Sequence, residues 1–499
     1  EIIALKLLKM GYKKGDIIVS MLPLLLEHIF FEFACFKLGI IWCPLDVRLK
    51  VVETVRCVKL LEPDVKMYCH PDDTDSEDKW GRKKYYIFKQ IAREVKANCP
   101  SIQEFLQFSL QEDADKGTMG ILNFLKDAKQ NWMSYQKDPK VWAEKKTLLD
   151  KAASKVKEDD PILIIYTTGT TGFPKPAMLT NTGILCQNFC MAKGFEITSQ
   201  DRMLVNLPPS HVGCQTEQLM TTIFAGGVSV ILHAFKADKT LKAIQEYKVT
   251  AFGQIPSLFV MEWRLPDYKK YDLSSLRFAL YGGQGVSKKF LTKLATMAPY
   301  ILASLGHDYP ITPLSIRKPM KEDGSAGKEV PEGEIGEICY KGPQVFKGYY
   351  KNEEATRKTI STDGYCYTGD LGYKDEKGLH LAGRGKFVIK PKGYQVYPPE
   401  VEAHIEKLPE VVLAAVCGAK HEVYSEGVVA FVQLRKEKSL TAQEILEHTK
   451  DLAAYKRPSL IIFLDEITLN RMDKTDYKTL NEILPKYIQE ERAKGGWDA

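Results

Sequence analysis

Hydrophobic and polar positions along the chain predict strands and helices in alternation. A short apolar run at residues 16–22 precedes a helical pattern at 27–39, and a second apolar run follows at 40–45. Short apolar strands between helices are typical of a parallel sheet that is covered on both faces. The same alternation returns after residue 161 and continues to about residue 290. We therefore expect an α/β fold whose large N-terminal domain is built on parallel sheets.

Other segments predict a different organisation. Residues 72–160 are dense in Lys, Asp and Glu and helical in spacing, which favours a solvated helical layer over a partner-binding arm. Short strands between Gly-rich turns at 332–383 indicate a small β unit. Two strands and two helices after residue 384 are enough for a small, mobile α+β domain. The expected domains are 1–383 and 384–499.

The composition narrows the class of protein. The chain has 499 residues, 44% of them hydrophobic and 27% charged, which is typical of a globular protein. Its net charge of +6 comes without a concentrated basic stripe, so we expect no nucleic-acid partner. Eleven scattered cysteines without a CxxC pair are interpreted as reduced thiols of a cytoplasmic protein.

The most apolar stretch and the start of the chain bear on membrane insertion and on completeness. Residues 17–45 are apolar but are interrupted by charged positions, whereas a bilayer span needs about 20 nearly uncharged residues. We therefore expect no integral membrane segment, and no charged region typical of a signal peptide precedes the stretch. The chain opens inside a helical pattern without a methionine, so we expect its true start to be missing.

The strongest chemical signal is the segment YTTGTTGFPK at residues 166–175. Glycines let backbone N–H groups face an anion, threonine hydroxyls add donors, and a final lysine adds positive charge. The spacing differs from that of the Walker loop. We predict a phosphate-binding loop whose contributing residues are Thr167, Thr168, Gly169, Thr170, Thr171, Gly172 and Lys175.

This segment resembles the phosphate loop of the adenylate-forming superfamily, which includes acyl-CoA synthetases, luciferases and peptide-synthetase adenylation domains. Six further blocks follow in the family's order, at residues 208–211, 281–284, 367–370, 383–386, 389–396 and 470–477. Together they span nearly the whole chain. Their detail is most similar to that of bacterial fatty-acyl or aryl acyl-CoA ligases.

The resemblance implies a role for each block. It implies catalytic roles for Lys474, Lys390 and Gln395, and a hinge at Lys386. Residues lining the substrate pocket would be His211, Gln254, Tyr281 and Gly282. Further nucleotide and cofactor contacts would come from Gly282, Gly283, Gln284, Asp370, Arg384, Lys392 and Gly393. Taken alone, Asp370 could be a turn residue, His211 a satisfied pocket histidine and Lys474 part of a solvated basic face.

The implied activity is that of an ATP-dependent acyl-CoA synthetase with ATP, Mg²⁺ and coenzyme A. A carboxylate would attack the α-phosphate to give an acyl-adenylate and pyrophosphate, and the CoA thiol would then release AMP. Such chemistry needs positioning and electrostatic stabilisation. The expected substrate is a medium- or long-chain fatty acid, with an aromatic or alicyclic acid as the other possibility. The C-terminal domain would swing about Lys386 to exchange Lys474 for the Gly393 loop.

Three departures from the family pattern bear on this hypothesis. Proline follows Lys175 where glycine is usual, and Asp473 precedes Lys474. The family's Thr-Glu segment, whose glutamate helps to hold Mg²⁺, is not found near residues 300–301, so no metal ligand is assigned. Either the gene lacks this segment or a loop is missing from the sequence, the second being favoured. Thr216-Glu217 lies too far upstream to replace it.

Two alternatives therefore remain. The chain could adenylate an acid for a non-CoA acceptor, although the loop at 392–395 favours CoA. It could also be a non-catalytic homologue that binds acyl or nucleotide ligands, if the Thr-Glu segment is truly deleted. The sequence does not fix the oligomeric state.

Overall fold

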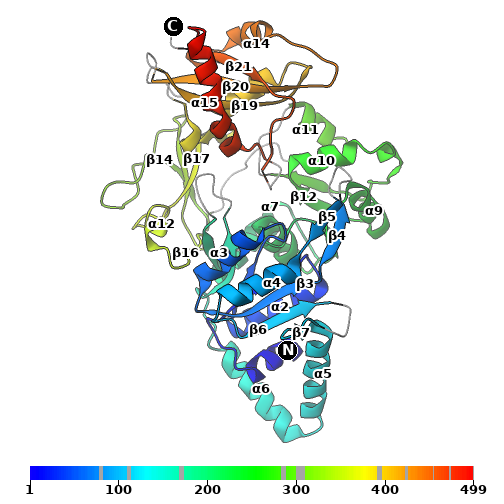
Figure 1. Cartoon of the computed structure of the whole chain (residues 1–499). Helices are drawn as coiled ribbons and strands as arrows, with labels where there is room; N and C mark the ends of the chain where they lie inside the picture. The colour runs from blue at the N-terminus through cyan, green and yellow to red at the C-terminus, as the bar shows by residue number, and fades with distance from the viewer. Residues whose placement is uncertain are drawn as a thin grey trace.

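The computed structural model describes residues 1–497 apart from 78–82, 110–113, 168–173, 283–287, 299–309, 390, 392–395, 422–424, 453 and 471–473. The chain folds into layers that Figure 1 shows stacked from the N-terminal sheet at the bottom to the C-terminal sheet at the top. Within this description, no helix has an apolar stretch long enough to cross a bilayer. All eleven cysteines are free.

The first sheet has the strand order β16-β9-β8-β2-β1-β3-β6-β7. The strands from β8 to β7 run parallel, as predicted, whereas β9 and β16 are antiparallel and form one edge. The strands are β1 (Ile17–Ser20), β2 (Ile41–Pro44), β3 (Val65–Pro71), β6 (Glu104–Phe108), β7 (Met119–Gly120), β8 (Pro161–Tyr166), β9 (Pro176–Thr180) and β16 (Gly348–Tyr349).

Helices cover both faces of this sheet. Ile17 and Val19 pack into the core on one face, while Ile18 packs into the core on the other, because successive strand residues point to opposite faces. This two-sided burial explains why the strands read as uninterrupted apolar runs. Helices α3 (Val51–Leu61) and α4 (Phe88–Asn98) contribute to one core, and α1 (Ile2–Lys9), α2 (Leu26–Leu38), α5 (Ile121–Gln136) and α6 (Pro139–Ala153) contribute to the other.

The prediction of a purely helical layer at 72–160 is wrong. Strands β6 and β7 lie in this segment and extend the first sheet, and β4 (Thr74–Glu77) pairs with β5 (Lys83–Tyr86). The β6 sequence EFLQF buries Phe105 on one face and Leu106 on the other, so tertiary packing overrides the charged surroundings. Helices α5 and α6 do project from the bottom of the molecule as a largely solvated pair (Figure 1).

The second sheet is wholly parallel in the order β11-β10-β12-β13. Its strands are β10 (Arg202–Val205), β11 (Val228–Ile231), β12 (Ala251–Gln254) and β13 (Phe278–Tyr281). Around it lie α7 (Asn181–Gly194), the π-helix η1 (Gly213–Met220), α8 (Thr221–Phe224), α9 (Ala237–Tyr247), α10 (Pro256–Trp263), η2 (Tyr268–Lys270) and α11 (Lys288–Leu294). The carboxyl ends of the strands lie at one edge, where loops can gather functional groups.

The expected β unit is an antiparallel sheet in the order β14-β15-β17-β18. It begins earlier than predicted, with β14 (Leu314–Arg317), and continues with β15 (Gly336–Tyr340), β17 (Cys366–Asp375) and β18 (Gly378–Arg384). Helix α12 (Glu353–Arg357) lies between β16 and β17 in the chain, and η3 (Gly385–Phe387) follows β18 directly. The predicted hinge residue Lys386 therefore lies in η3, just beyond the last strand of the unit.

The C-terminal region has its own sheet, β19-β20-β21, with a hydrophobic core on each face. The strands are β19 (Val411–His421), β20 (Ser425–Leu434) and β21 (Leu460–Phe463). The helices are α13 (Pro398–Ile405), α14 (Ala442–His448), η5 (Thr449–Asp451), η6 (Ala454–Lys456) and α15 (Tyr477–Ala493). This confirms the expected α+β mixture, and the exact boundary at 383/384 stays a prediction.

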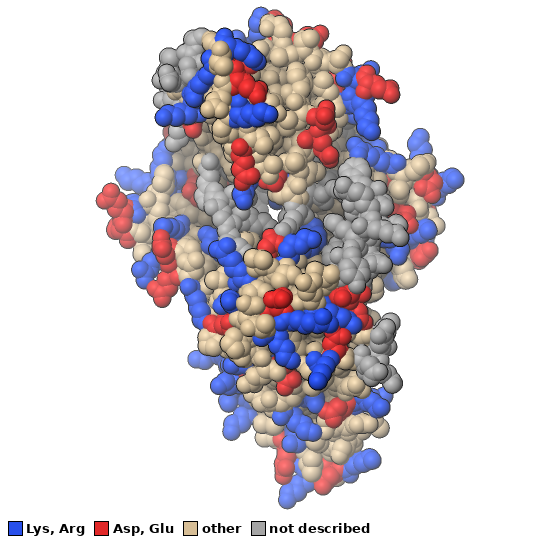
Figure 2. Space-filling view, viewed as in Figure 1, with Lys and Arg blue, Asp and Glu red and all other residues tan. Residues whose placement is uncertain are grey.

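Charged side chains are spread over the molecule. Figure 2 shows Lys and Arg interspersed with Asp and Glu on the face in view, with no continuous basic stripe. Opposite charges also pair locally, as in the Lys14–Asp160 and Arg277–Asp201 contacts.

Candidate active site

The neck of the predicted phosphate loop is closed by two reciprocal hydrogen bonds. The Thr167 N–H donates to the carbonyl oxygen of Lys175 at 2.9 Å, and the Lys175 N–H donates to Thr167 Oγ1 at 3.2 Å. Between them, residues 168–173, including Thr168, Gly169, Thr170, Thr171 and Gly172, lie outside the described part of the chain. The neck holds the two ends of the loop together at the end of the β8–β9 pair.

The loop joins two antiparallel strands, and helix α7 starts only after β9. Pro176 opens β9, a position where a strand tolerates the missing N–H. The Lys175 ammonium lies 4.5 Å from the ring centroid of Tyr349, which is a cation–π distance. The replacement of the family's glycine by proline therefore fits the local structure without disturbing the position of Lys175.

Gln254 and Tyr281 meet at the carboxyl ends of two neighbouring strands. Parallel pairing of β12 and β13 sets them opposite each other. Burial raises the pKa of Tyr281, whose ring packs edge-on against Phe290 with centroids 5.8 Å apart. Gly282 follows in an exposed position with no atom within 4 Å of where a Cβ would lie. The structure thus brings these three predicted residues together, while Gly283 and Gln284 lie outside the described residues.

A chain of buried amides holds Gln254 in place. Asn206 Nδ2 donates to Gln254 Oε1 at 2.9 Å, and Gln254 Nε2 donates to Glu262 Oε1 at 2.8 Å. Gln218 extends the chain by donating to Asn206 Oδ1 at 3.1 Å and to the Gly253 carbonyl at 2.7 Å. The Gln254 amide is thus engaged on both sides, so it shapes the wall of the site from within the protein.

Glu262 ends this amide chain in a fully buried position. Its Oε2 atom is buried and has no hydrogen-bond partner among the described residues. Burial raises the pKa of Glu262 to about 8, because charge is unfavourable in an apolar surrounding. The group is therefore mainly a neutral carboxylic acid at pH 7, and it can accept from Gln254 without placing a charge in the core.

His211 lies in the turn before η1 with a defined protonation state. The Gly213 N–H donates to His211 Nδ1 at 3.0 Å, so Nδ1 carries no proton and Nε2 carries one in the neutral ring. Burial lowers the pKa of His211, and the nearby charges of Lys474 and Arg48 lower it further. Asp46 opposes them weakly. The ring is therefore a neutral hydrogen-bond donor at physiological pH.

The position of Lys474 is set by a tight turn in the C-terminal region. The Asn470 N–H donates to the Lys474 carbonyl at 2.6 Å, and the Lys474 N–H donates to Asn470 Oδ1 at 3.3 Å. Residues 471–473 within the turn are not described. Figure 1 shows the chain before α15 reaching down from the top sheet towards the middle of the molecule. This reach brings the Lys474 charge close enough to act on His211.

The turn is anchored on the C-terminal side by Tyr477. Its hydroxyl donates to Glu402, and its ring packs on Phe387 with centroids 5.3 Å apart. Burial raises the pKa of Glu402 to about 7, against the effect of its bond to Tyr477. Phe387 ends η3, so the helix that follows Lys474 is packed against the segment that contains the predicted hinge. Side chains of Arg384 and Lys386 are not described.

Asp46 and Arg48 belong to the same neighbourhood and were not singled out from the sequence. Arg48 Nε donates to Asp46 Oδ1 at 2.9 Å, and Arg48 forms a second bond to Oδ2 at 2.7 Å. Both residues follow β2, at the carboxyl edge of the first sheet. That placement was the available signal, because charged residues directly after a parallel strand lie where ligands bind.

Asp370 lies in β17, half-buried, after a residue with left-handed backbone. Gly369 has φ of 78°, and its N–H donates to Glu337 Oε1 at 2.8 Å. The Asp370 N–H donates to Thr368 Oγ1 at 3.1 Å, so a threonine hydroxyl bonds the backbone here. Pairing with β18 sets Asp370 opposite Arg384. The two residues predicted to contact the nucleotide are therefore neighbours across one ladder.

The remaining predicted residues cannot be placed. Lys390, Lys392, Gly393 and Gln395 lie outside the described residues, as does the junction at 300–301 where the Thr-Glu segment is expected. Glu217, from the upstream Thr-Glu pair, lies in η1 as the helical pattern predicted. In the described parts of the chain, no group of three His, Cys, Asp or Glu residues could hold a metal ion.

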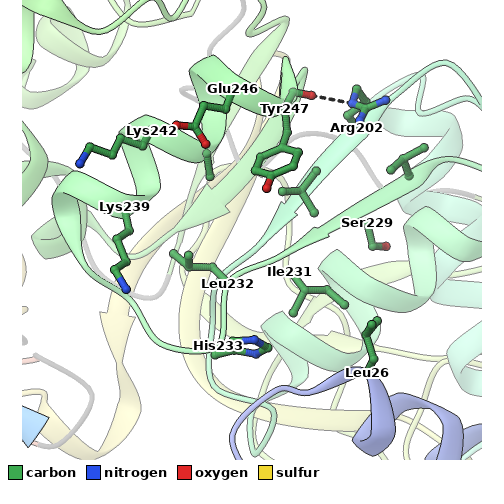
Figure 3. A pocket seen from close by; sticks show the side chains of 13 residues that line it. Leu26, Arg202, Ser229, Ile231, Leu232, His233, Lys239, Lys242, Glu246 and Tyr247 are labelled. Atoms are coloured by element: carbon green, nitrogen blue, oxygen red, sulfur yellow. Dashed lines mark hydrogen bonds between the residues drawn. The ribbon is translucent and has the colours of Figure 1, made fainter.

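A separate pocket of about 550 Å³ lies against the edge strand β11 and helix α9 (Figure 3). Apolar strand residues face Lys239, Lys242 and Tyr247 across it, and Arg202 Nε donates to the Tyr247 carbonyl at 2.6 Å. None of the predicted site residues lines this pocket. The candidate active site is therefore the region around His211 where Lys474, Arg48 and Asp46 come together. The pocket at β11 is a different feature.

Comparison with known proteins gives a consistent family match. The model of the AMP-binding enzyme family matches residues 2–309, and that of the AMP-binding enzyme C-terminal domain matches residues 400–474. The second match ends at Lys474, the residue that the sequence assigns to catalysis. The two models together cover most of both expected domains.

Individual relatives agree. The chain is 27% identical to putative acyl-CoA synthetase YngI of Bacillus subtilis over 95% of its own length and 89% of that protein. It is 29% identical to the indoleacetate–CoA ligase of Aromatoleum aromaticum, covering 78% and 80% of the two chains. The crystal structure of ATP-bound MatB from Rhodopseudomonas palustris superposes with a TM-score of 0.77 at 24% identity, covering 97% and 92%. This likeness confirms the expected two-part α/β fold.

The raised pKa of Glu262 makes stability depend on pH. The unfolded carboxyl ionises near pH 4.5 and the folded one near pH 8, so the unfolded state loses its proton first as the pH rises between these values. The free energy of unfolding contributed by this group should fall over that window by a few kcal/mol, at about 1.4 kcal/mol per pKa unit. Glu262→Gln should flatten the slope by about one proton in urea unfolding at pH 5, 6.5 and 8.

The exposed Glu246 offers a matched control for this measurement. Glu246→Gln makes the same chemical change on the surface of α9 and should leave the slope as in the wild type. Identical slopes in Glu262→Gln and the wild type would contradict a buried neutral carboxyl at the end of the amide chain.

Proposed function

The chain belongs to the AMP-binding enzyme family, and from this premise we propose that it is an ATP-dependent acid–CoA ligase that works through an acyl-adenylate. The observation that carries the proposal is the family match over both parts of the chain, and the nearness of Lys474 to His211 agrees with it. A lysine from the C-terminal region is thereby available where the carboxyl ends of the first-sheet and second-sheet strands come together.

The charges at this point suit the first half-reaction. A carboxylate and the α-phosphate of ATP are both anions, and their approach needs fixed positive charge in an enclosed site. Lys474 would supply that charge near His211, beside the Arg48–Asp46 ion pair. The neutral His211 ring offers its Nε2–H to an oxygen without being a proton acceptor at that atom. The carboxylate oxygen would bond to the α-phosphorus as the bond to pyrophosphate breaks.

The nucleotide would be held from two other directions. The two ends of the predicted phosphate loop are joined at Thr167 and Lys175, and Asp370, next to Gly369, would accept from the ribose hydroxyls. Magnesium would enter with the ATP phosphates, since Mg²⁺ is commonly bound through phosphates and one or two carboxylates. In the second half-reaction the CoA thiol would attack the acyl carbonyl and AMP would leave.

An aryl carboxylic acid is our proposed substrate class, ahead of the fatty acid that the sequence alone favoured. The indoleacetate–CoA ligase is similar to this chain over four-fifths of its own length. The aromatic rings of Tyr281 and Phe290 near the strand ends would also suit a flat ring. A cytoplasmic location fits the eleven free cysteines.

Exchange of labelled pyrophosphate into ATP tests the adenylation step directly. Purified protein should catalyse exchange only when a suitable acid is present, and adding CoA should give the thioester and AMP. The panel should include arylacetates, cinnamates and C8–C16 fatty acids. Exchange with aryl acids supports the proposed class, and exchange with fatty acids alone would overturn it. Exchange without thioester formation would favour a non-CoA acceptor, and no exchange with any acid would favour a non-catalytic homologue.

Lys474→Ala should reduce pyrophosphate exchange by about 10²–10³, the usual scale for removing one charge that stabilises a transition state. Thioester formation from supplied acyl-adenylate should be spared, because Lys474 is assigned to adenylation alone. The control is Lys478→Ala, which removes a solvent-exposed lysine from the neighbouring helix. Equal losses in both half-reactions would argue against the assigned role.

Asp370→Ala should weaken ATP binding by about 10- to 100-fold, since a carboxylate accepting from the ribose hydroxyls forms charge-assisted hydrogen bonds. Isothermal titration with a non-hydrolysable ATP analogue measures this directly. Asp375→Asn, at the other end of β17, should bind the analogue as the wild type does. Unchanged affinity in Asp370→Ala would exclude a ribose contact.

A further inference from the structure

Glu217 lies beside His211 on the π-helix η1. A Cβ built on Gly213 would lie 3.1 Å from His211 Nδ1 and 3.6 Å from Glu217 Oε2, so both side chains lie against the same glycine. The Cys214 and Gln215 N–H groups both donate to the His211 carbonyl, at 3.1 and 3.2 Å, which joins the histidine to the first turn of η1. His211 and Glu217 are therefore held on one continuous element.

The Glu217 carboxyl is enclosed but keeps contact with solvent. Glu217 as a whole residue is exposed to solvent. Surrounding protein atoms nevertheless desolvate its carboxyl group and raise the pKa, as expected for a side chain inside a cleft. No hydrogen bond or charge of a described residue offsets this desolvation. Asp46, by contrast, is paired with Arg48. Glu217 is thus a polar group placed where a ligand could supply its partner.

The surroundings make such a partner valuable. A polar group in an enclosed site loses the hydrogen bonds of bulk water, and an unmade bond there is costly. Next to it, Leu207 presents a methyl group, which cannot donate a hydrogen bond. The Gly213 N–H is already bonded to His211 Nδ1. Short π-helical segments are also frequent at functional sites, where they shift side chains out of the α-helical register.

We propose that Glu217 recognises the tail of the acid substrate, and that this substrate carries an O–H or N–H group at the end remote from its carboxylate. The inference rests on the proposed function, in which the reacting carboxylate lies at Lys474 and His211. Glu217 lies six residues after His211, within η1, and both side chains lie against Gly213, so the tail would extend from Lys474 past the histidine towards this carboxyl.

Recognition of this kind gives strong discrimination. A site built to bond a substrate hydroxyl or N–H rejects an analogue without it, because the protein group is then left unpaired. Glu217 can accept from either donor whether it is ionised or neutral. Hydrophobic contact alone would discriminate far less between two acids that differ in one donor.

Matched pairs of acids test the proposal by pyrophosphate exchange. One pair is indole-3-acetate and 1-methylindole-3-acetate, and the other is 4-hydroxycinnamate and 4-methoxycinnamate. In each pair the donor is removed and little else changes. The wild-type enzyme should favour the donor-bearing acid of at least one pair by about 10-fold or more in kcat/KM. Glu217→Leu should reduce that ratio to about one, through loss of activity on the donor-bearing acid.

Two further variants separate recognition from structure. Glu217→Gln keeps a carbonyl acceptor and should retain most of the preference, while Glu246→Leu removes an exposed glutamate elsewhere and should retain all of it. Exchange with both members of each pair at a ratio that Glu217→Leu does not alter would overturn the tail-recognition proposal but leave the ligase proposal standing. Absence of exchange with every acid, including the fatty acids, would instead overturn the proposed function on which it rests.

Discussion

The site depends on positive charge carried from one part of the chain into an enclosed space built by another. Lys474 belongs to a turn next to the C-terminal sheet, whereas His211 belongs to the loop that leads into η1. Coulomb interactions weaken strongly in water, so such a charge acts usefully only where burial excludes solvent. The desolvation that lowers the His211 pKa is therefore also the condition under which Lys474 can stabilise anions there.

The walls of this space are held by neutral polar groups. Gln218, Asn206, Gln254 and Glu262 form a chain of hydrogen bonds that crosses the carboxyl ends of β10 and β12. A buried network whose members are paired fixes one arrangement, and an unpaired charge in it would be expensive. A protonated Glu262 ends the network without placing a negative charge in the core.

Much of the fold could be predicted from the sequence because two-sided burial leaves a clear trace. The runs around Ile17 and Ile41 read as strands since both of their faces are covered. Strand β6 was missed because five residues between charged helices carry too weak a periodicity, and its burial depends on the neighbouring β3. The antiparallel β9 was not predicted, because its five residues lie directly between the phosphate-loop segment and the helical pattern of α7.

The site was predictable to a smaller degree, and for a physical reason. Motifs marked Lys474, Asp370 and His211 because their chemistry is carried by short local patterns. Arg48 and Glu217 belong to no local motif: Arg48 is marked only by its place after a parallel strand, and the sequence around Glu217 does not show that it lies near His211. Gln254 was marked as a pocket residue, but only the structure shows that its amide is engaged with Asn206 and Glu262.

Desolvation links the reacting end and the tail end of the site. It lowers the pKa of His211 and raises that of Glu217, so it favours the neutral form of both groups. The uncompensated positive charge near His211 then comes chiefly from Lys474, because Asp46 pairs with Arg48. A tail that carried its own negative charge would meet the Glu217 oxygens and bring no compensating cation. Under the proposed function, the same enclosure would favour an acid whose tail carries no negative charge and can donate a hydrogen bond.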